Sequence, residues 1–116
     1  WIDAGQTDRA ARLIDAVLRA GPVETLAPWY YRQGRCLEAA AKSDEDRLRA
    51  ALAYMRVPVH YPGDPLCAEC LYRAAMIHIR LGHADRATGL LREAMRYSPP
   101  ADLKARCEQA MQEACR

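Results

Sequence analysis

The chain has 116 residues, of which 51% are hydrophobic and 28% are charged, and this balance is typical of a single globular domain. Seventeen basic and fifteen acidic residues leave a net charge of only +2, which gives no indication of a nucleic-acid partner. No apolar run approaches the roughly 20 residues that a membrane span needs. Helix-forming Ala, Leu, Arg and Glu are abundant and β-branched residues are scattered, so we predict an all-α fold.

Glycines and prolines divide the first half of the chain into three predicted helices. Thr7 is placed to cap a helix over residues 7–20, whose apolar residues recur on one face. A second helix is predicted over residues 26–41, with Pro28 in its first turn. Ser43 and the acidic residues after it have capping-box spacing, so they open a third helix that Pro58 is expected to end or kink.

The second half of the chain contains three more predicted helices. Asp64 followed by Pro65 indicates an N-cap and the first turn of a fourth helix, which reaches about residue 81. Gly82 turns the chain into a fifth helix over residues 84–97, and the pair Pro99-Pro100 separates it from a sixth. Because the connections are short, neighbouring helices are expected to form antiparallel hairpins.

One pattern of four positions recurs three times, at offsets of 40 and then 37 residues. A small residue is followed by a large apolar residue, then by a second apolar residue, and finally by a proline. The three sets are Ala10, Ile14, Val17 and Pro22; Ala50, Tyr54, Val57 and Pro62; and Ala87, Leu91, Ala94 and Pro99. A small residue lets two helices approach closely while the large residue fills the groove opposite, so the pattern predicts repeated helix pairs.

The helix that opens each pair carries a second recurring set. Its members are Tyr30, Gln33, Gly34 and Leu37; Leu71, Ala74, Ala75 and His78; and Leu103, Arg106, Cys107 and Ala110. Together the two sets resemble the tetratricopeptide (TPR) family, whose pattern is W-x2-L-G-x2-Y, then A-x3-F, then P. The resemblance covers almost the whole chain and is best over residues 69–99, where Gly82 occupies the turn between the two helices.

This resemblance implies an architecture, namely a TPR-like right-handed superhelix of antiparallel helix pairs, or α-solenoid segment. Residues 1–116 would form one repeat domain with units at about residues 1–22, 26–62 and 65–99 and a terminal helix over 100–115. The first unit lacks most of its first helix and residue 1 is Trp, so we expect the chain to be a fragment of a longer protein.

Five cysteines raise the question of a thiol or metal site. Cys67 and Cys70 have CxxC spacing, and the amide dipoles of a first helical turn would stabilise a thiolate at Cys67. A redox CxxC normally follows a strand, however, and a zinc site usually combines two close pairs of ligands. Structural cysteines without a cofactor or metal are therefore the favoured interpretation, and a thiol or metal module at this pair is a less favoured one.

The sequence shows no set of residues typical of catalysis, so we predict that the protein is not an enzyme. Its histidines, His60, His78 and His83, are dispersed, and no Ser–His–Asp set, phosphate-binding glycine loop or HExxH motif is present. His78 falls at a packing position of the repeat, which favours a buried histidine with its hydrogen bonds satisfied.

In TPR proteins the first helices of successive pairs line a concave groove, and the resemblance implies such a groove here. The candidate residues lie one step beyond the packing positions: Tyr31, Arg35 and Glu38; Tyr72, Met76 and Ile79; and Lys104, Glu108 and Met111. Aromatic, methionine and arginine side chains are enriched at interfaces, which favours a binding groove. The alternative is that several of these residues simply pack against a neighbouring helix or against a missing upstream repeat. The Lys and Asn pattern of chaperone-binding TPR clamps is absent, so a groove for acidic chaperone tails is not expected.

The predicted function is thus non-catalytic protein–protein interaction or scaffolding, with another protein or protein segment as the partner. The alternative is a helical appendage of a larger enzyme or regulator whose chemistry lies outside this chain. Unpaired cysteines favour a reducing cytoplasm. The Tyr-Pro-x-x-Pro spacing of residues 61–65 is similar to bacterial TPR proteins of the cell envelope, so the periplasm or cell envelope is the alternative to the favoured cytoplasm.

Overall fold

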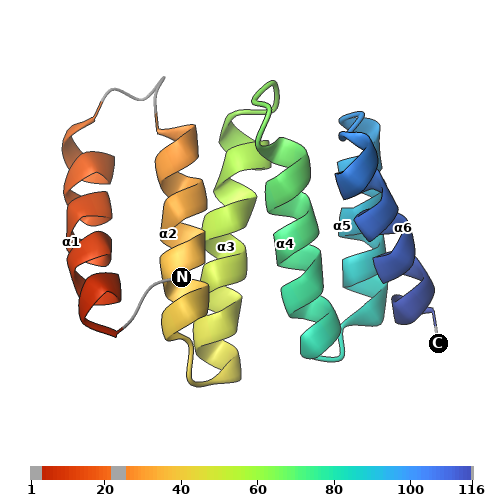
Figure 1. Ribbon diagram of the computed structural model, residues 1–116, viewed down its shortest axis with the longest axis horizontal. Coiled ribbons are helices and arrows are strands. Elements are labelled where there is room, and N and C mark those ends of the chain that lie inside the picture. Colours follow the sequence, from red (N-terminus) through yellow and green to blue (C-terminus); the bar gives the residue numbers. More distant parts are fainter. Residues whose placement is uncertain (1–3, 22–25, 116) are drawn as a thin grey trace.

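The computed structural model describes residues 4–21 and 26–115, and within these ranges the regular structure is α-helical without a strand. The helices are α1 (Ala4–Ala20), α2 (Ala27–Ala40), α3 (Asp44–His60), α4 (Cys67–Arg80), α5 (Ala84–Arg96) and α6 (Ala101–Ala114). Figure 1 shows them side by side in chain order, from α1 at one edge to α5 and α6 at the other. The prediction of an all-α fold is confirmed.

Each helix packs against the next one along the chain, and α4 also contacts α6. The connections alternate between the two ends of the row, so that successive helices are antiparallel (Figure 1). The shortest dimension of the molecule is 21 Å, which is the thickness of about two helices. The molecule is therefore a layer of helix hairpins, in which α2 pairs with α3 and α4 with α5.

Helix starts follow the predicted capping residues in one case and depart from them in two. The Ser43 Oγ accepts a hydrogen bond from the Asp46 N–H at 3.1 Å, so Ser43 is the N-cap of α3 as predicted. The predicted cap at Thr7 is wrong, because α1 begins three residues earlier at Ala4.

Helix α4 also begins later than predicted. The Asp64 Oδ1 accepts a hydrogen bond from the Leu66 N–H at 2.8 Å, and its carbonyl accepts one from the Cys67 N–H at 3.1 Å. Asp64 therefore caps a separate turn, and the helix proper starts at Cys67 rather than at Pro65.

Of the two effects expected of Pro58, ending or kinking α3, the first does not occur. Pro58 is buried in the last turn, and the helix continues to His60 before the pair Pro62-Gly63. Gly82 does terminate α4 as predicted: its φ of 82° lies in the left-handed region, and the next residue, His83, donates its N–H to the His78 carbonyl at 2.8 Å.

The repeat positions of α3 and α5 lie in the hydrophobic core. Ala50 and Ala87 are fully buried, as are the large residues that follow them, Tyr54 and Leu91. In the first set Ile14 is buried while Ala10 and Val17 are only partly so, and Pro22 lies outside the described residues. The core therefore runs from α2 to α6, and α1 covers one end of it.

Among the described residues, none of the helices has both the length and the apolar character required to cross a membrane.

Candidate functional site

Three alternate helices, α2, α4 and α6, share one surface, which we call the α2–α4–α6 face. It includes Tyr31, Arg35 and Glu38 on α2, Tyr72, Arg73, Met76, Ile79 and Arg80 on α4, and Arg106 on α6. Side chains from the different helices contact one another across this surface, as the next paragraphs describe.

Tyr31 occupies the centre of the α2 part of the face. Its ring centroid lies 6.0 Å from that of Tyr54 in α3. The guanidinium groups of Arg73 and Arg35 lie 5.6 Å and 5.9 Å from the same ring, at cation–π distance. Arg35 also donates a hydrogen bond from Nη1 to the Tyr31 hydroxyl at 3.3 Å. An aromatic side chain is thus held in place between two arginines and remains half-buried.

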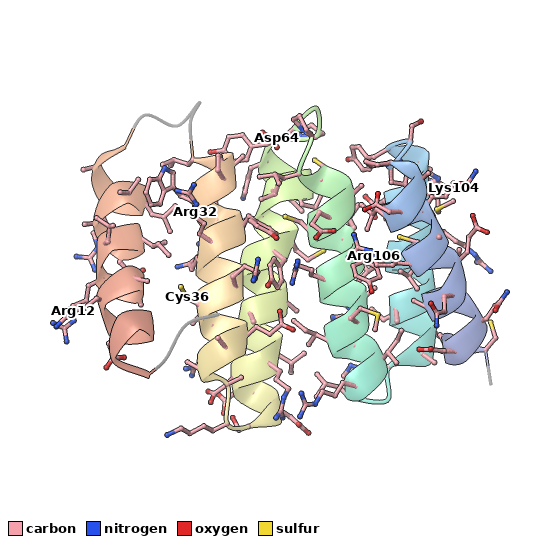
Figure 2. All side chains as sticks on the ribbon, viewed as in Figure 1. Arg12, Arg32, Cys36, Asp64, Lys104 and Arg106 are labelled. Carbon is pink, nitrogen blue, oxygen red and sulfur yellow. The ribbon has the colours of Figure 1, made fainter. Side chains whose placement is uncertain are left out.

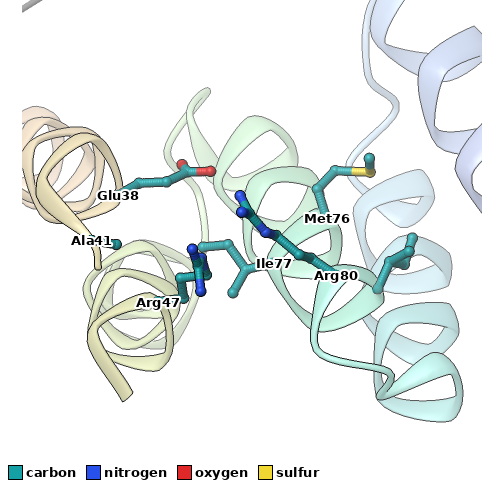
Figure 3. Close-up of a pocket in the computed structure, with 7 residues that line it drawn as sticks. Glu38, Ala41, Arg47, Met76, Ile77 and Arg80 are labelled. Carbon is teal, nitrogen blue, oxygen red and sulfur yellow. The ribbon is translucent and has the colours of Figure 1, made fainter. Parts of the chain in front are cut away.

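Glu38 lies further along α2, and a buried side chain of the core holds its carboxylate in place. The Tyr54 hydroxyl donates a hydrogen bond to its Oε1 at 2.8 Å. Burial, together with this bond to a carboxylate, raises the pKa of the Tyr54 hydroxyl well above its ordinary value, so the tyrosine stays protonated. Glu38 also borders a hollow of about 450 Å³ that lies between the α2–α3 hairpin and α4 (Figure 3). We call it the larger hollow, because a smaller one lies beside it.

The larger hollow has an apolar floor and a charged rim. Its lining residues are Glu38, Ala41, Arg47, Met76, Ile77, Ile79 and Arg80. A second, smaller hollow of about 160 Å³ lies between α4 and α6, and its lining residues are Tyr72, Met76, Arg106, Gln109, Ala110 and Glu113. Because Met76 lines both, the two hollows are adjacent parts of one surface.

Arg106 connects α6 to α4 on this face. Its guanidinium lies 5.2 Å from the Tyr72 ring centroid and 3.9 Å from the Glu69 Oε2, and Figure 2 shows it between the two helices. The other oxygen of Glu69 accepts from the Arg73 Nε at 3.3 Å. The buried Oε2 has no hydrogen-bond partner in the described part of the chain, and the Arg106 and Arg73 guanidinium groups together offset the charge of the carboxylate.

Sequence reasoning missed several of these residues. Glu69 and Arg73 have the i, i+4 spacing of a helical ion pair, a signal that was available in the sequence. Arg106 was aligned with core positions, yet its side chain is 44% exposed, whereas Leu103, Cys107 and Ala110 from the same set are buried.

The candidate groove residues on α6 are less involved than those on α2 and α4. Lys104 and Glu108 are exposed and border neither hollow, and Figure 2 shows Lys104 on the outer edge of α6. Met111 is half-buried and packs against the core. The structure therefore brings together Tyr31, Arg35 and Glu38 with Tyr72, Met76 and Ile79, and leaves Lys104 and Glu108 apart.

The CxxC pair lies in the core. Cys67 and Cys70 are fully buried, and the Cys67 Sγ donates to the Tyr61 carbonyl at 3.0 Å. Burial raises the pKa of the Cys67 thiol and raises that of Cys70 to about 12, the opposite of what a reactive thiolate requires. The expectation that the helix dipole would favour a thiolate at Cys67 is therefore wrong, because loss of hydration outweighs it.

His78 is buried, as predicted, and has a hydrogen-bond partner. Its Nδ1 lies 3.1 Å from the Nδ1 of His83, which is exposed at the start of α5. Burial, the Arg86 charge and His83 together lower the pKa of His78. Within residues 4–21 and 26–115, His, Cys, Asp and Glu side chains form no group of three or more able to hold a metal ion.

Comparison with known proteins finds no matching family model, no matching curated protein and no matching solved structure.

Proposed function

We propose that this chain is a non-catalytic protein-binding module that holds a segment of another protein on its α2–α4–α6 face. The observation that carries the proposal is the makeup of this surface. Two adjacent hollows are bordered by the half-buried side chains of Tyr72 and Met76 and by the arginines Arg47, Arg80 and Arg106. Half-buried Tyr31, with Arg35 and Arg73 at its ring, extends this surface over α2. These residue types supply most of the binding energy at protein interfaces, because they offer large contact areas and strong hydrogen bonds.

The same proposal includes the finer architecture, a TPR-like array of helix pairs. Three features support it: successive antiparallel hairpins, buried small and large residues at the recurring positions of α3 and α5, and a left-handed glycine between α4 and α5. In such an array the first helices of each pair line the binding side, which matches the helices that form this face.

Tyr72 is the residue whose loss should weaken partner binding most. It borders the smaller hollow, is half-buried, and its rigid ring is already positioned beside Arg106. Tyr72→Ala should weaken binding by about 2 kcal/mol, or roughly thirtyfold, without unfolding the domain. Leu52→Ala is the matched control, because Leu52 is a large side chain 63% exposed on α3, away from both hollows.

The measurement begins with quantitative mass spectrometry of proteins captured by the immobilised chain and by both variants. A captured partner is then purified, and its dissociation constants are determined by calorimetry. A specific partner should be lost with Tyr72→Ala and retained with Leu52→Ala. Equal affinity for the wild type and the Tyr72 variant would place the binding surface elsewhere on the molecule.

A further inference from the structure

The larger hollow combines an apolar lining with an arginine that has no ion-pair or hydrogen-bond partner among the described residues. Ala41, Met76, Ile77 and Ile79 supply the apolar lining. Its volume of about 450 Å³ falls within the range of natural ligand pockets, roughly 300–1,000 Å³, so a single large side chain can enter it.

The charged groups around this hollow differ in how they are engaged. Arg47 pairs with Asp44 at 3.0 Å, and Glu38 accepts the Tyr54 hydroxyl. Arg80 is exposed and, within the described part of the chain, forms no ion pair or hydrogen bond through its side chain. Figure 3 shows the guanidinium groups of Arg47 and Arg80 and the Glu38 carboxylate directed into the space between α2–α3 and α4.

The balance of these charges indicates the chemistry of the occupant. Asp44 offsets the charge of Arg47, and the Glu38 carboxylate is held by a hydrogen bond from the core, so Arg80 is the charged group of this lining that stays unpaired among the described residues. A guanidinium binds a carboxylate through two parallel hydrogen bonds, which a lysine cannot reproduce. A partner group that pairs with Arg80 is therefore an acid.

On these grounds we infer that the larger hollow binds a protein segment in which a large apolar side chain is next to an Asp or Glu. The apolar side chain fills the hollow over Met76 and Ile77, and the neighbouring carboxylate pairs with Arg80. The inference rests on the proposed function and specifies the partner that this part of the face selects.

A random 12-residue peptide library displayed on phage, selected on the immobilised 116-residue chain, tests the inference. Selected peptides should be enriched in Asp or Glu beside Leu, Ile, Met or Phe. A selected peptide, made synthetically, should bind Arg80→Glu about tenfold more weakly or worse, and Arg80→Lys at an intermediate level. Arg92→Glu is the matched control, because Arg92 is exposed on α5 and borders neither hollow, and it should bind like the wild type.

A charge exchange provides a second readout. Replacing the acidic residue of the selected peptide by Lys should abolish wild-type binding and restore part of the binding to Arg80→Glu. Basic or uncharged peptides that ignore Arg80→Glu but are lost with Tyr72→Ala would overturn this inference and leave the proposed binding face standing. Peptides insensitive to both variants, or no enrichment over a blank support, would overturn both.

Discussion

At the scale of single residues, Gly34 sets the distance between α2 and α3. The ring of Tyr54 lies directly against its backbone, and a Cβ added at Gly34 would be 2.6 Å from two ring atoms. Tyr54 is fully buried and its hydroxyl is tied to Glu38, so the ring cannot move aside without breaking that bond. The close approach of the two helices therefore depends on the absence of a side chain at this position.

We expect Gly34→Ala to lower the free energy of unfolding by about 1–3 kcal/mol, because it overpacks this contact. Gly89→Ala is the control, since Gly89 is exposed within α5 and nothing lies within 4 Å of an added Cβ. That change should raise stability by about 0.5–1 kcal/mol through helix propensity alone. Urea denaturation of the wild type and both variants measures these changes. A Gly34→Ala midpoint equal to that of the wild type would contradict the close packing against Tyr54.

His78 should make stability depend on pH. Burial is the largest cause that lowers the pKa of His78 below the ordinary value of 6.5. Arg86 and His83, which face the His78 ring, lower this pKa further. The folded state therefore favours the neutral ring. The stability that the neutral His78 ring contributes is therefore fully present when the pH is above 6.5, the pKa of an unperturbed histidine. It is lost as the pH falls through the lower pKa of His78 in the folded state.

The measurement is the urea midpoint of the wild type, of His78→Gln and of His60→Gln between about pH 7.5 and 5. The midpoint of the wild type should fall as the pH drops. The His78 variant should show a shallower dependence even if its stability at pH 7.5 is lower. His60 is exposed at the end of α3, so its variant should keep the wild-type slope. An unchanged slope in His78→Gln would assign the titration to another group.

At the scale of secondary-structure elements, α4 buries two cysteine thiols in the core, where solvent and reagents do not reach them. Its first turn carries Cys67 and Cys70, both in the core, and burial raises the pKa of each thiol. Cys36 and Cys107 are also buried, while Cys115 is exposed after the end of α6. The CxxC spacing here reflects two core positions three residues apart on one helical face.

We therefore expect a thiol reagent such as DTNB to label one of the five cysteines rapidly in the folded protein at pH 8. The others should react only when the chain unfolds. Cys115→Ser should remove the rapid phase, and the double change of Cys67 and Cys70 to Ser should leave it intact. Rapid labelling of either CxxC cysteine would show that α4 opens at its start.

The elements themselves were largely predictable because their ends are set by local chemistry. Ser43 and Gly82 stop or start a helix through their own hydrogen bonds or φ angle, and both were predicted correctly. The expected end of α3 at Pro58 does not occur: the proline is buried, and whether a helix continues past a proline in its last turn depends on such tertiary packing. The pairing of Arg106 with Glu69 likewise depends on how α6 lies against α4, which no local pattern specifies.

At the scale of the whole molecule, each helix packs mainly against the helices next to it in the chain. Among the described residues, α4 with α6 is the one extensive helix contact that skips a neighbour. Such a chain resembles a one-dimensional stack, in which each element depends on the elements beside it. The face that carries the proposed site is consequently assembled stepwise. Tyr31 meets Arg73 where α2 lies near α4, and Tyr72 meets Arg106 where α4 meets α6.

The two ends of this stack should differ in how much stability they contribute. Within its described side chains α1 buries only Ile14 fully, so a chain lacking residues 1–25 should lose about 2–3 kcal/mol and still unfold in one transition. Helix α6 buries Leu103, Cys107 and Ala110 and compensates Glu69, so a chain ending at residue 99 should lose about 4 kcal/mol or more. Circular dichroism during urea denaturation measures both losses. If removal of α1 proved the more damaging, the core would have to be centred on α1 and α2, and the stack described here would be wrong.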